Sequence, residues 1–279
     1  YNSLQSALAG AERLVPLLEE EDRQIANEVP REFKHIESID FEHVWFSYDN
    51  NDVYALEDFT LSIKAGEFIG IVGPSGSGKS TLLSLLMGLY KPTKGAIYIN
   101  GIDIANYDSS VLRHLMGYVF QQAYLFKGSI KDNLTLFDTS ISYDDMVDAA
   151  KQVNLDSMIE QLPEGYHTPV GYLGSLLSDG QKQLLAFGRT LIRKTPILLL
   201  DEATANIDSH TEKQIQASIE NIRGSKTIVS IAHRLSTVQD ANKIVYMEYG
   251  KIIEKGSFEE LINSKGAFYN LWSNQQSGS

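Results

Sequence analysis

The stretch GPSGSGKST, residues 73–81, constrains this chain more than any other. It matches the pattern G-x-x-x-x-G-K-[ST], in which inward-turned backbone N–H groups, the positive end of a following helix and a lysine form a cradle for phosphate groups. The apolar run FIGIV precedes it and predicts a buried strand, and LLSLLMGLY follows it with leucines at helical spacing. A strand, a glycine-rich turn and a helix are the context that the motif requires, so the sequence predicts a site for a nucleoside triphosphate. The structural alternative is a flexible glycine–serine turn that happens to contain a lysine.

Every member of this stretch is a predicted nucleotide-binding residue. The Lys79 amine is expected to reach the outer phosphates, and the Ser80 hydroxyl is expected to join the coordination shell of Mg²⁺. The predicted set is Gly73, Pro74, Ser75, Gly76, Ser77, Gly78, Lys79, Ser80 and Thr81.

A second element lies further along the chain, where four aliphatic residues, 197–200, precede Asp201 and Glu202. Such a run predicts a strand buried on both faces, whose carboxyl end lies at the sheet edge where ligands bind in open α/β folds. We therefore expect Asp201 to hold Mg²⁺ through water, and Glu202 to orient or deprotonate an attacking water. The alternative is that the two acids only cap a strand next to a helix.

Composition narrows the class of protein. The chain has 279 residues, of which 43% are hydrophobic, and a formal net charge of −12. An acidic balance of this size argues against a broad nucleic-acid surface, which needs lysine and arginine to displace phosphate counterions. The absence of cysteine excludes disulfides and thiolate-ligated metals. Because no run of 18 apolar residues and no signal peptide is visible, we expect a soluble piece.

The order of the predicted elements describes the organisation of the chain. Residues 1–24 have the spacing of an amphipathic helix, and the Asn100-Gly101 pair predicts a β-hairpin. Strand and helix patterns then alternate on both sides of a helical segment that contains predicted helices at 144–153 and 155–162. A further helix at 179–193 precedes the strand that ends in Asp201. This pattern predicts a mixed α/β sheet covered by helices.

Further motifs make the chain resemble the ATP-binding domain of ABC transporters, most closely that of exporters. LSDGQKQ, residues 177–183, is similar to the family signature LSGGQ-x-Q, and IAHR, residues 231–234, is similar to the segment that carries the family's switch histidine. The resemblance covers about residues 36–265. It implies an α/β P-loop NTPase core of ABC type with a mixed sheet, an antiparallel β subdomain and an inserted α-helical subdomain.

The resemblance also implies roles at the matching positions. Tyr48 would stack on adenine, and Gln121 would reach Mg²⁺ and sense the membrane domain. The implied catalytic residues are Glu202, His233, Lys79 and Gln121, and the implied Mg²⁺ ligands are Ser80, Gln121 and Asp201. In this family two domains pair head to tail, so a partner's ATP would face Ser178, Asp179, Gly180, Gln181 and Asp208. Taken singly, Tyr48 reads as a strand aromatic, Gln121 as a polar strand end and His233 as a structural histidine.

Two positions depart from the family pattern. Asp179 stands where the signature has its first glycine, and a carboxylate there would repel the γ-phosphate of a partner's ATP by a few kcal/mol, on the order of the Coulomb energy at about 4 Å and an effective dielectric of 20. One reading is an asymmetric pair of different chains; the other is an acid in a favourable first helical turn with its side chain turned outward. Tyr172 replaces a glutamate in the loop that exporters use to touch the membrane domain, and we assign it no role.

The resemblance implies the motor domain of an exporter on the cytoplasmic face of the cell membrane, which hydrolyses ATP with Mg²⁺. We expect residues 1–35 to link to a membrane domain of the same polypeptide, 36–265 to form the ATPase domain and 266–279 to form a C-terminal helix and tail. Within the ATPase domain, 36–122 and 182–265 would form the core and 123–181 the helical subdomain. The implied partner is a second ABC ATPase domain, with a different chain favoured, and no nucleic acid is expected. The alternatives are a soluble ABC ATPase acting on nucleic acid or ribosomes, and a regulatory module that binds ATP without hydrolysing it.

Overall fold

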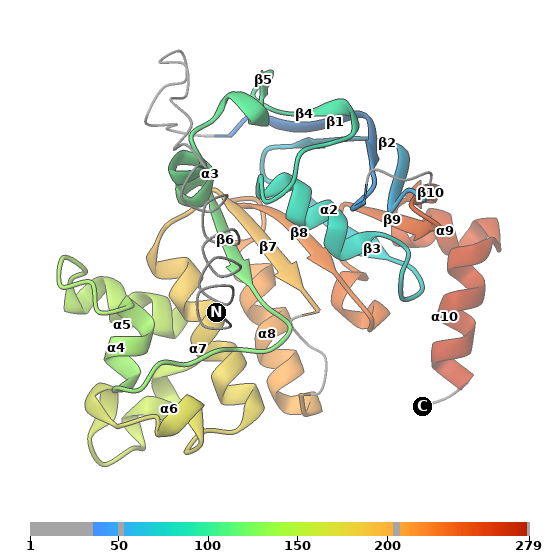
Figure 1. Ribbon diagram of the computed structural model, residues 1–279. Helices are drawn as coiled ribbons and strands as arrows, with labels where there is room; N and C mark the ends of the chain where they lie inside the picture. Colours follow the sequence, from blue (N-terminus) through green and yellow to red (C-terminus); the bar gives the residue numbers. More distant parts are fainter. Residues whose placement is uncertain (1–35, 50–52, 203–206, 278–279) are drawn as a thin grey trace, which may run out of the picture. The chain divides into compact units, whose positions relative to one another are not determined.

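Residues 36–49, 53–202 and 207–277 are described by a computed structural model, and they form two β-sheets with helices between and beside them (Figure 1). The predicted helix in residues 1–24 and the predicted link at 1–35 lie outside these residues. Within the described residues, no helix has the length and apolar character that a membrane span requires.

The first sheet has four antiparallel strands in the order β2-β1-β4-β5. Apolar and polar residues alternate along β2, which gives the sheet one buried face, as expected for an antiparallel sheet. The predicted hairpin is confirmed: Asn100 and Gly101 connect β4 to β5, with φ angles of 53° and 74° that a two-residue turn with φ > 0 requires. The strands are β1 (Ser38–Phe46), β2 (Leu56–Lys64), β4 (Lys94–Ile99) and β5 (Ile102–Asp103).

The second sheet has six strands in the order β10-β9-β3-β8-β7-β6. All neighbouring pairs are parallel except β9 and β10, and both β3 and β8 are buried along their whole length. Helices must therefore cover both faces, which explains the continuous apolar runs in the sequence. The strands are β3 (Phe68–Val72), β6 (Met116–Val119), β7 (Ile197–Asp201), β8 (Thr227–Ile231), β9 (Lys243–Glu248) and β10 (Lys251–Gly256).

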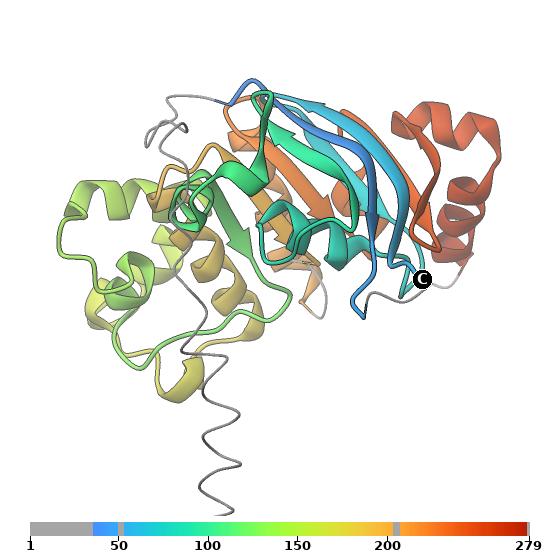
Figure 2. The same ribbon diagram turned by 45° about the horizontal axis from the view of Figure 1, so that its top comes forward.

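Helix α2 (Lys79–Leu86) begins in the glycine-rich stretch and runs through the space between the two sheets (Figures 1 and 2). Its leucines Leu82, Leu83, Leu85 and Leu86 are all buried, because both sheets contribute apolar surface around the helix. This packing fixes the direction of the helix, and with it the direction in which its N-terminal N–H groups point.

The remaining helices confirm the predicted order, with changes at some ends. The helix predicted at 155–162 is shorter in the structure. The helices are α3 (Ser109–Leu115), α4 (Ile130–Thr135), α5 (Tyr143–Gln152), α6 (Asp156–Glu160), α7 (Asp179–Ile192), α8 (Ser209–Ile222), α9 (Phe258–Ser264) and α10 (Ala267–Ser277), with short 3₁₀ turns η1 (Ile104–Asn106), η2 (Gly165–His167), η3 (Tyr172–Gly174) and η4 (Leu235–Val238).

Two of these helices, α3 and α4, were not predicted. Both are too short for an apolar period to be visible, and side-chain caps hold their first turns. The Asp108 carboxylate accepts from the backbone of Ser110 at the start of α3, and a capping box joins Ser129 and Asp132 at the start of α4.

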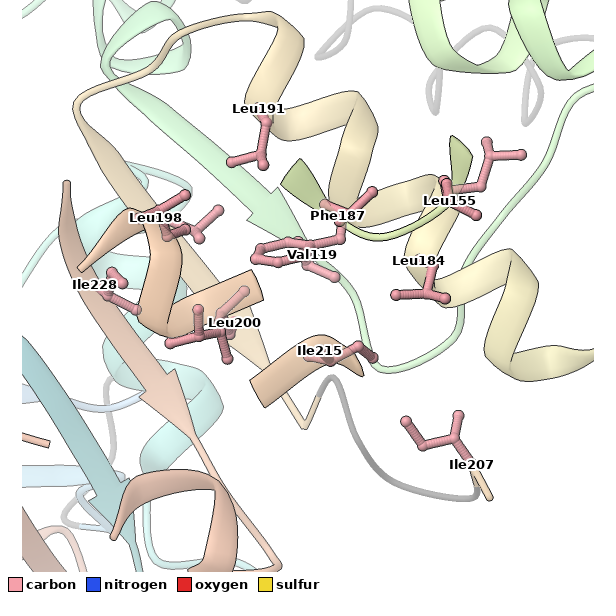
Figure 3. Packing of buried hydrophobic residues seen from close by; sticks show 14 of the residues in the cluster. Val119, Leu155, Leu184, Phe187, Leu191, Leu198, Leu200, Ile207, Ile215 and Ile228 are labelled. Atoms are coloured by element: carbon pink, nitrogen blue, oxygen red, sulfur yellow. The ribbon is translucent and has the colours of Figure 1, made fainter. Parts of the chain in front are cut away.

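One buried cluster joins the sheet to the helical segment between β6 and β7. Figure 3 shows Phe187 and Leu184 of α7 between the strand residues Val119 and Leu200 on one side and Leu155 on the other. The helical segment therefore shares its core with the six-stranded sheet through α7. Because α7 begins within the LSDGQKQ stretch, the position of that stretch depends on the same packing.

Candidate functional site

Four neighbouring strands of the six-stranded sheet end in candidate residues. Strand β3 leads into the 73–81 loop, β8 leads to His233, β7 ends in Asp201 followed by Glu202, and β6 leads to Gln121. These strands are parallel and adjacent, in the order β3-β8-β7-β6, with Asp201 in register with Ile231. Parallel pairing therefore places residues up to 160 positions apart in the sequence at one edge of the sheet.

The 73–81 loop presents unpaired donors. Within the described part of the chain, the backbone N–H groups of Gly78, Lys79 and Ser80 meet no acceptor, as expected at a helix N-terminus that has no side-chain cap. Gly78 has a φ of 98°, and a Cβ at this position would lie 2.4 Å from the Ala55 carbonyl oxygen. Only glycine fits between the helix start and the neighbouring backbone, so this close approach fixes where the free donors lie. Such donors suit an anion.

Lys79 is almost fully buried, and its ammonium donates to the carbonyl oxygens of Gly73 (2.9 Å) and Pro74 (2.8 Å). Burial lowers its pKa, and the negative charges of Glu202 and Asp201 oppose this shift. The cation is thus held by neutral carbonyl groups beside two carboxylates. An anion bound at the loop would supply a negative charge to pair with this desolvated ammonium.

Glu202 is held at both carboxylate oxygens. His233 Nε2 pairs with Oε1, and the Gln121 side-chain amide donates to Oε2. The Glu202 side chain is only 15% exposed, and its backbone has a φ of 49°, in the left-handed region that costs a non-glycine residue free energy. The backbone N–H of Glu202 donates to the Ile231 carbonyl oxygen (3.0 Å), which ties it to strand β8. Three separate segments thereby position one carboxylate.

Asp201 has a partner that the sequence analysis missed. The Tyr118 hydroxyl, on β6, donates to Asp201 Oδ2 at 2.7 Å. Burial raises the pKa of Tyr118, and the hydrogen bond and negative charge of Asp201 raise it further, so the hydroxyl stays protonated and keeps donating. The sequence signal was weak, since a tyrosine inside a buried strand more often packs as a core aromatic.

Tyr48 lies two residues after β1 with 53% of its surface exposed. Its ring is edge-on to Phe46 (4.8 Å between centroids) and to Tyr90 (5.2 Å), and its hydroxyl lies 3.0 Å from Thr81 Oγ1. The ring is thus held beside the first turn of α2 with much of its surface open. Tyr90, itself 45% exposed, is a second aromatic here that the sequence analysis did not single out.

The LSDGQKQ residues are not brought to the phosphate loop. Within the described residues, no hydrogen bond or ion pair joins 178–181 to 73–81. Ser178 caps α7 in a capping box with Gln181, and Asp179 is 77% exposed and pairs with Lys182 at 2.9 Å. Gly180 packs against Thr211.

Asp208, the remaining candidate, lies next to the start of α8. Its carboxylate accepts from the backbone N–H and the hydroxyl of Thr211 (3.0 and 2.8 Å). The candidates therefore form two groups on this chain: one around the phosphate loop and Glu202, and one at the start of α7 and α8.

Comparison with known proteins decides the family. A family model described as ABC transporter matches residues 56–205, which is more than half of the chain. The chain belongs to the ABC transporter family. Its fold is accordingly that of the ABC ATPase domain, a P-loop NTPase fold, as the sequence predicted.

Individual ABC relatives match almost the whole chain. It is 41% identical over 275 residues to the ABC transporter ATP-binding protein exp8 of Streptococcus pneumoniae, covering 99% of this chain and 47% of that protein. It is 37% identical over 273 residues to the fatty acid ABC transporter ATP-binding/permease protein of Mycobacterium tuberculosis, covering 97% and 43%. A solved structure of a bacterial Atm1-family ABC exporter with ATP bound matches with a TM-score of 0.87 at 36% identity, covering 97% of this chain and 47% of that one. The chain thus spans about half the length of these ABC proteins.

One further contact connects the two groups of the ABC site. The Gln183 side chain, the second glutamine of LSDGQKQ, is buried and donates to the Phe120 carbonyl oxygen at 2.9 Å. Phe120 directly precedes Gln121, so the helix that carries the ABC signature holds the segment that contacts Glu202. The motif itself had indicated Gln183, although no role followed from the sequence.

The oxygen donors of this ABC site suit a hard cation whose other ligands are waters and the phosphates of the bound substrate. Ser80 offers a hydroxyl, Asp201 a carboxylate and Gln121 an amide oxygen. In the described ranges, no group of three or more His, Cys, Asp or Glu side chains could hold a metal by itself. Mg²⁺ typically binds through one or two protein oxygens, several waters and substrate phosphates, so these few oxygen donors beside a phosphate loop suit it.

Proposed function

We propose that this chain is the ATP-hydrolysing motor domain of an ABC exporter, acting on ATP together with Mg²⁺. The observation that carries the proposal is the placement of Glu202. Its carboxylate is contacted by both His233 and Gln121, and Glu202 directly follows strand β7, which lies two places in the sheet from β3, the strand that leads into the phosphate loop. The relatives include ATP-binding/permease proteins, which supports the exporter assignment.

Each residue has a proposed role. The N–H groups at the start of α2 and the Lys79 ammonium bind the phosphates, and Tyr48 presents the open part of its ring to adenine. Ser80, Asp201 and Gln121 would hold Mg²⁺, which neutralises charge on the phosphates when bound. Glu202 orients the attacking water, and His233 keeps the Glu202 carboxylate in place while stabilising charge on the transferred group.

The proposed partner at the phosphate loop is a second ABC ATPase domain. This fits the separation of the two residue groups, because 178–181 do not reach the phosphate loop of their own chain. Asp179 is solvent-exposed and paired with Lys182, so its charge is partly compensated in the single chain. We propose a different chain as the partner, since a partner with glycine at this position would present no carboxylate to the γ-phosphate.

The proposed contact with the transmembrane part is an apolar groove beside Gln121. It has a volume of about 590 Å³, and its exposed aromatics include Phe120 (61% exposed) and Tyr124 (60%). Exposed aromatic clusters of this kind mark sites of protein association. In this arrangement residues 1–35 link to the transmembrane part, and 36–265 form the ATPase domain with a helical subdomain at 123–181. Residues 266–279 form the C-terminal helix and tail, and the domain works at the cytoplasmic face of the membrane.

The test is the ATPase rate of the purified chain as a function of its concentration, with Glu202→Gln as the matched variant. We expect ATP binding in both proteins, and a loss of kcat of at least about a hundredfold in the variant. A rate that rises roughly with the square of concentration would indicate self-pairing, whereas turnover only with a second ABC chain would support a different partner. Normal turnover in Glu202→Gln would contradict the assignment.

A further inference from the structure

The side chain of Gln275, near the end of α10, bonds to the backbone on both sides of Arg234. Its Nε2 donates to the His233 carbonyl oxygen at 2.6 Å, and its Oε1 accepts from the Leu235 N–H at 3.2 Å. A carboxamide has one face with a donor and an acceptor, and both are used here on residues two apart, as a neighbouring strand would use them. The segment beyond the end of β8 thus has a substitute for a strand neighbour, supplied by the C-terminal helix.

The same segment is held from a second helix. Glu212 of α8, whose side chain is only 10% exposed, pairs with the Arg234 guanidinium and accepts from the Ser236 hydroxyl (2.9 Å). The two helices therefore bind alternate residues of 233–236. Helix α8 contacts the side chains of Arg234 and Ser236, and α10 contacts the backbone of His233 and Leu235. The His233 ring itself takes part in neither set of contacts and is left to contact Glu202.

Helix α10 is itself firmly placed, so Gln275 projects from a fixed support. At its start, the Glu254 carboxylate accepts from the backbone N–H groups of Ala267 (2.6 Å) and Phe268 (3.1 Å), which suits a negative charge at a helix N-terminus. Phe268 is fully buried, and both it and Trp272 pack edge-on against Phe258 of α9. A hollow of about 470 Å³ lies beside the end of α10 and the 233–236 segment, and Gln275 is one of the residues that line it.

We infer that Gln275 is a positioning residue for ATP hydrolysis, acting through the backbone of His233. This rests on the proposed function, since it assigns Gln275 to the same pair of His233 and Glu202. The carbonyl that Gln275 binds and the ring that contacts Glu202 belong to the same residue, His233. If loss of the Gln275 carboxamide lets this backbone move, the ring moves away from the Glu202 carboxylate with it. Displacements of about 1 Å in a catalytic geometry cost up to a hundredfold in rate.

The test uses the 279-residue chain with three variants. Gln275→Ala removes both hydrogen bonds, and Gln275→Glu keeps the acceptor for Leu235 but replaces the donor to His233 with an oxygen. Gln276→Ala is the matched control, because Gln276 is the exposed neighbour on the same helix. The measurements are kcat and KM for ATP, the melting temperature, and hydrogen exchange at the Leu235 amide.

The inference predicts a loss of kcat on the order of tenfold in both Gln275 variants, with KM for ATP within about twofold of the unchanged chain. Leu235 should lose protection from exchange in Gln275→Ala and retain it in Gln275→Glu, while Gln276→Ala resembles the unchanged chain throughout. A merely structural role would instead lower the melting temperature and leave kcat per folded molecule unchanged.

Two further outcomes would each overturn the inference. One is normal kcat in Gln275→Ala, and the other is unchanged protection of Leu235 in that variant. Both outcomes are compatible with ATP hydrolysis by the chain, so they leave the proposed function intact. A chain without turnover under any condition, including a supplied second ABC domain, would refute the proposed function and the inference with it.

Discussion

Gly180 and Gly188 lie on the same helix, α7, and substitution by alanine should destabilise the chain at Gly180 but not at Gly188. Both are buried, and both occupy ordinary helical backbone. At Gly180, a Cβ would lie 2.6 Å from Thr211 Oγ1, 2.8 Å from its Cγ2 and 2.9 Å from its Cβ. At Gly188, the nearest atom is the terminal Cδ2 of Leu134 at 3.1 Å, which a small side-chain rotation can move.

The sizes of the opposing free-energy contributions decide whether each substitution stabilises or destabilises the chain. Replacing glycine with alanine inside a helix gains about 0.5–1 kcal/mol, and this gain applies to both sites. At Gly180 it is opposed by overpacking, which costs about 1–3 kcal/mol, and by strain on two hydrogen bonds from Thr211 to Asp208, worth about 0.5–1.5 kcal/mol each. We therefore expect Gly180→Ala to lower the free energy of unfolding by about 1–3 kcal/mol. Gly188→Ala should leave it unchanged or raise it by up to about 1 kcal/mol.

Thermal unfolding of the two variants beside the unchanged chain measures the difference. For a domain of this size, 1 kcal/mol corresponds to about 2–4 °C, so Gly180→Ala should melt roughly 2–12 °C lower and Gly188→Ala at the same temperature or slightly higher. Equal melting temperatures for the two variants would refute the reasoning, because they share the helix and the substitution and differ only in what the new Cβ meets.

Two other predictions follow from the site. In Tyr118→Phe, the free energy of unfolding should fall less steeply above about pH 10 than in the unchanged chain. Burial raises the pKa of Tyr118 in the folded state. The stability that the protonated hydroxyl contributes is therefore full below the unfolded pKa of about 10 and is lost as the pH rises beyond it. Urea unfolding between about pH 8 and 11, a range that brackets the unfolded pKa, measures the free energy of unfolding of both proteins. An identical dependence of that free energy on pH in the two proteins would contradict the prediction. Gly78→Ala should lower the affinity for ATP by at least about tenfold, because its Cβ would meet the Ala55 carbonyl oxygen at 2.4 Å and the φ of 98° disfavours alanine. Calorimetric titration with ATP would show the weaker binding, and unchanged affinity would mean that the loop tolerates the shift.

The sequence by itself predicted what depends on local spacing. The 73–81 loop with its flanking strand and helix, the two acids after a buried strand and the Asn100-Gly101 hairpin each lie within a stretch of fewer than about 20 residues, where residue pattern and backbone preference act together. The short helices α3 and α4 escaped prediction even though their caps are local, because neither is long enough to show a period.

Only the tertiary structure decided which of these local pieces meet. The strand order β3-β8-β7-β6 brings Gln121 and His233 to the two oxygens of Glu202, and no local pattern specifies that order. The Tyr118 bond to Asp201 spans 83 positions and the Gln275 bond to His233 spans 42. Such contacts depend on the packing of strands and helices from distant parts of the chain, which the burial of a shared apolar core determines, and a single sequence records that core only as apolar residues without their partners.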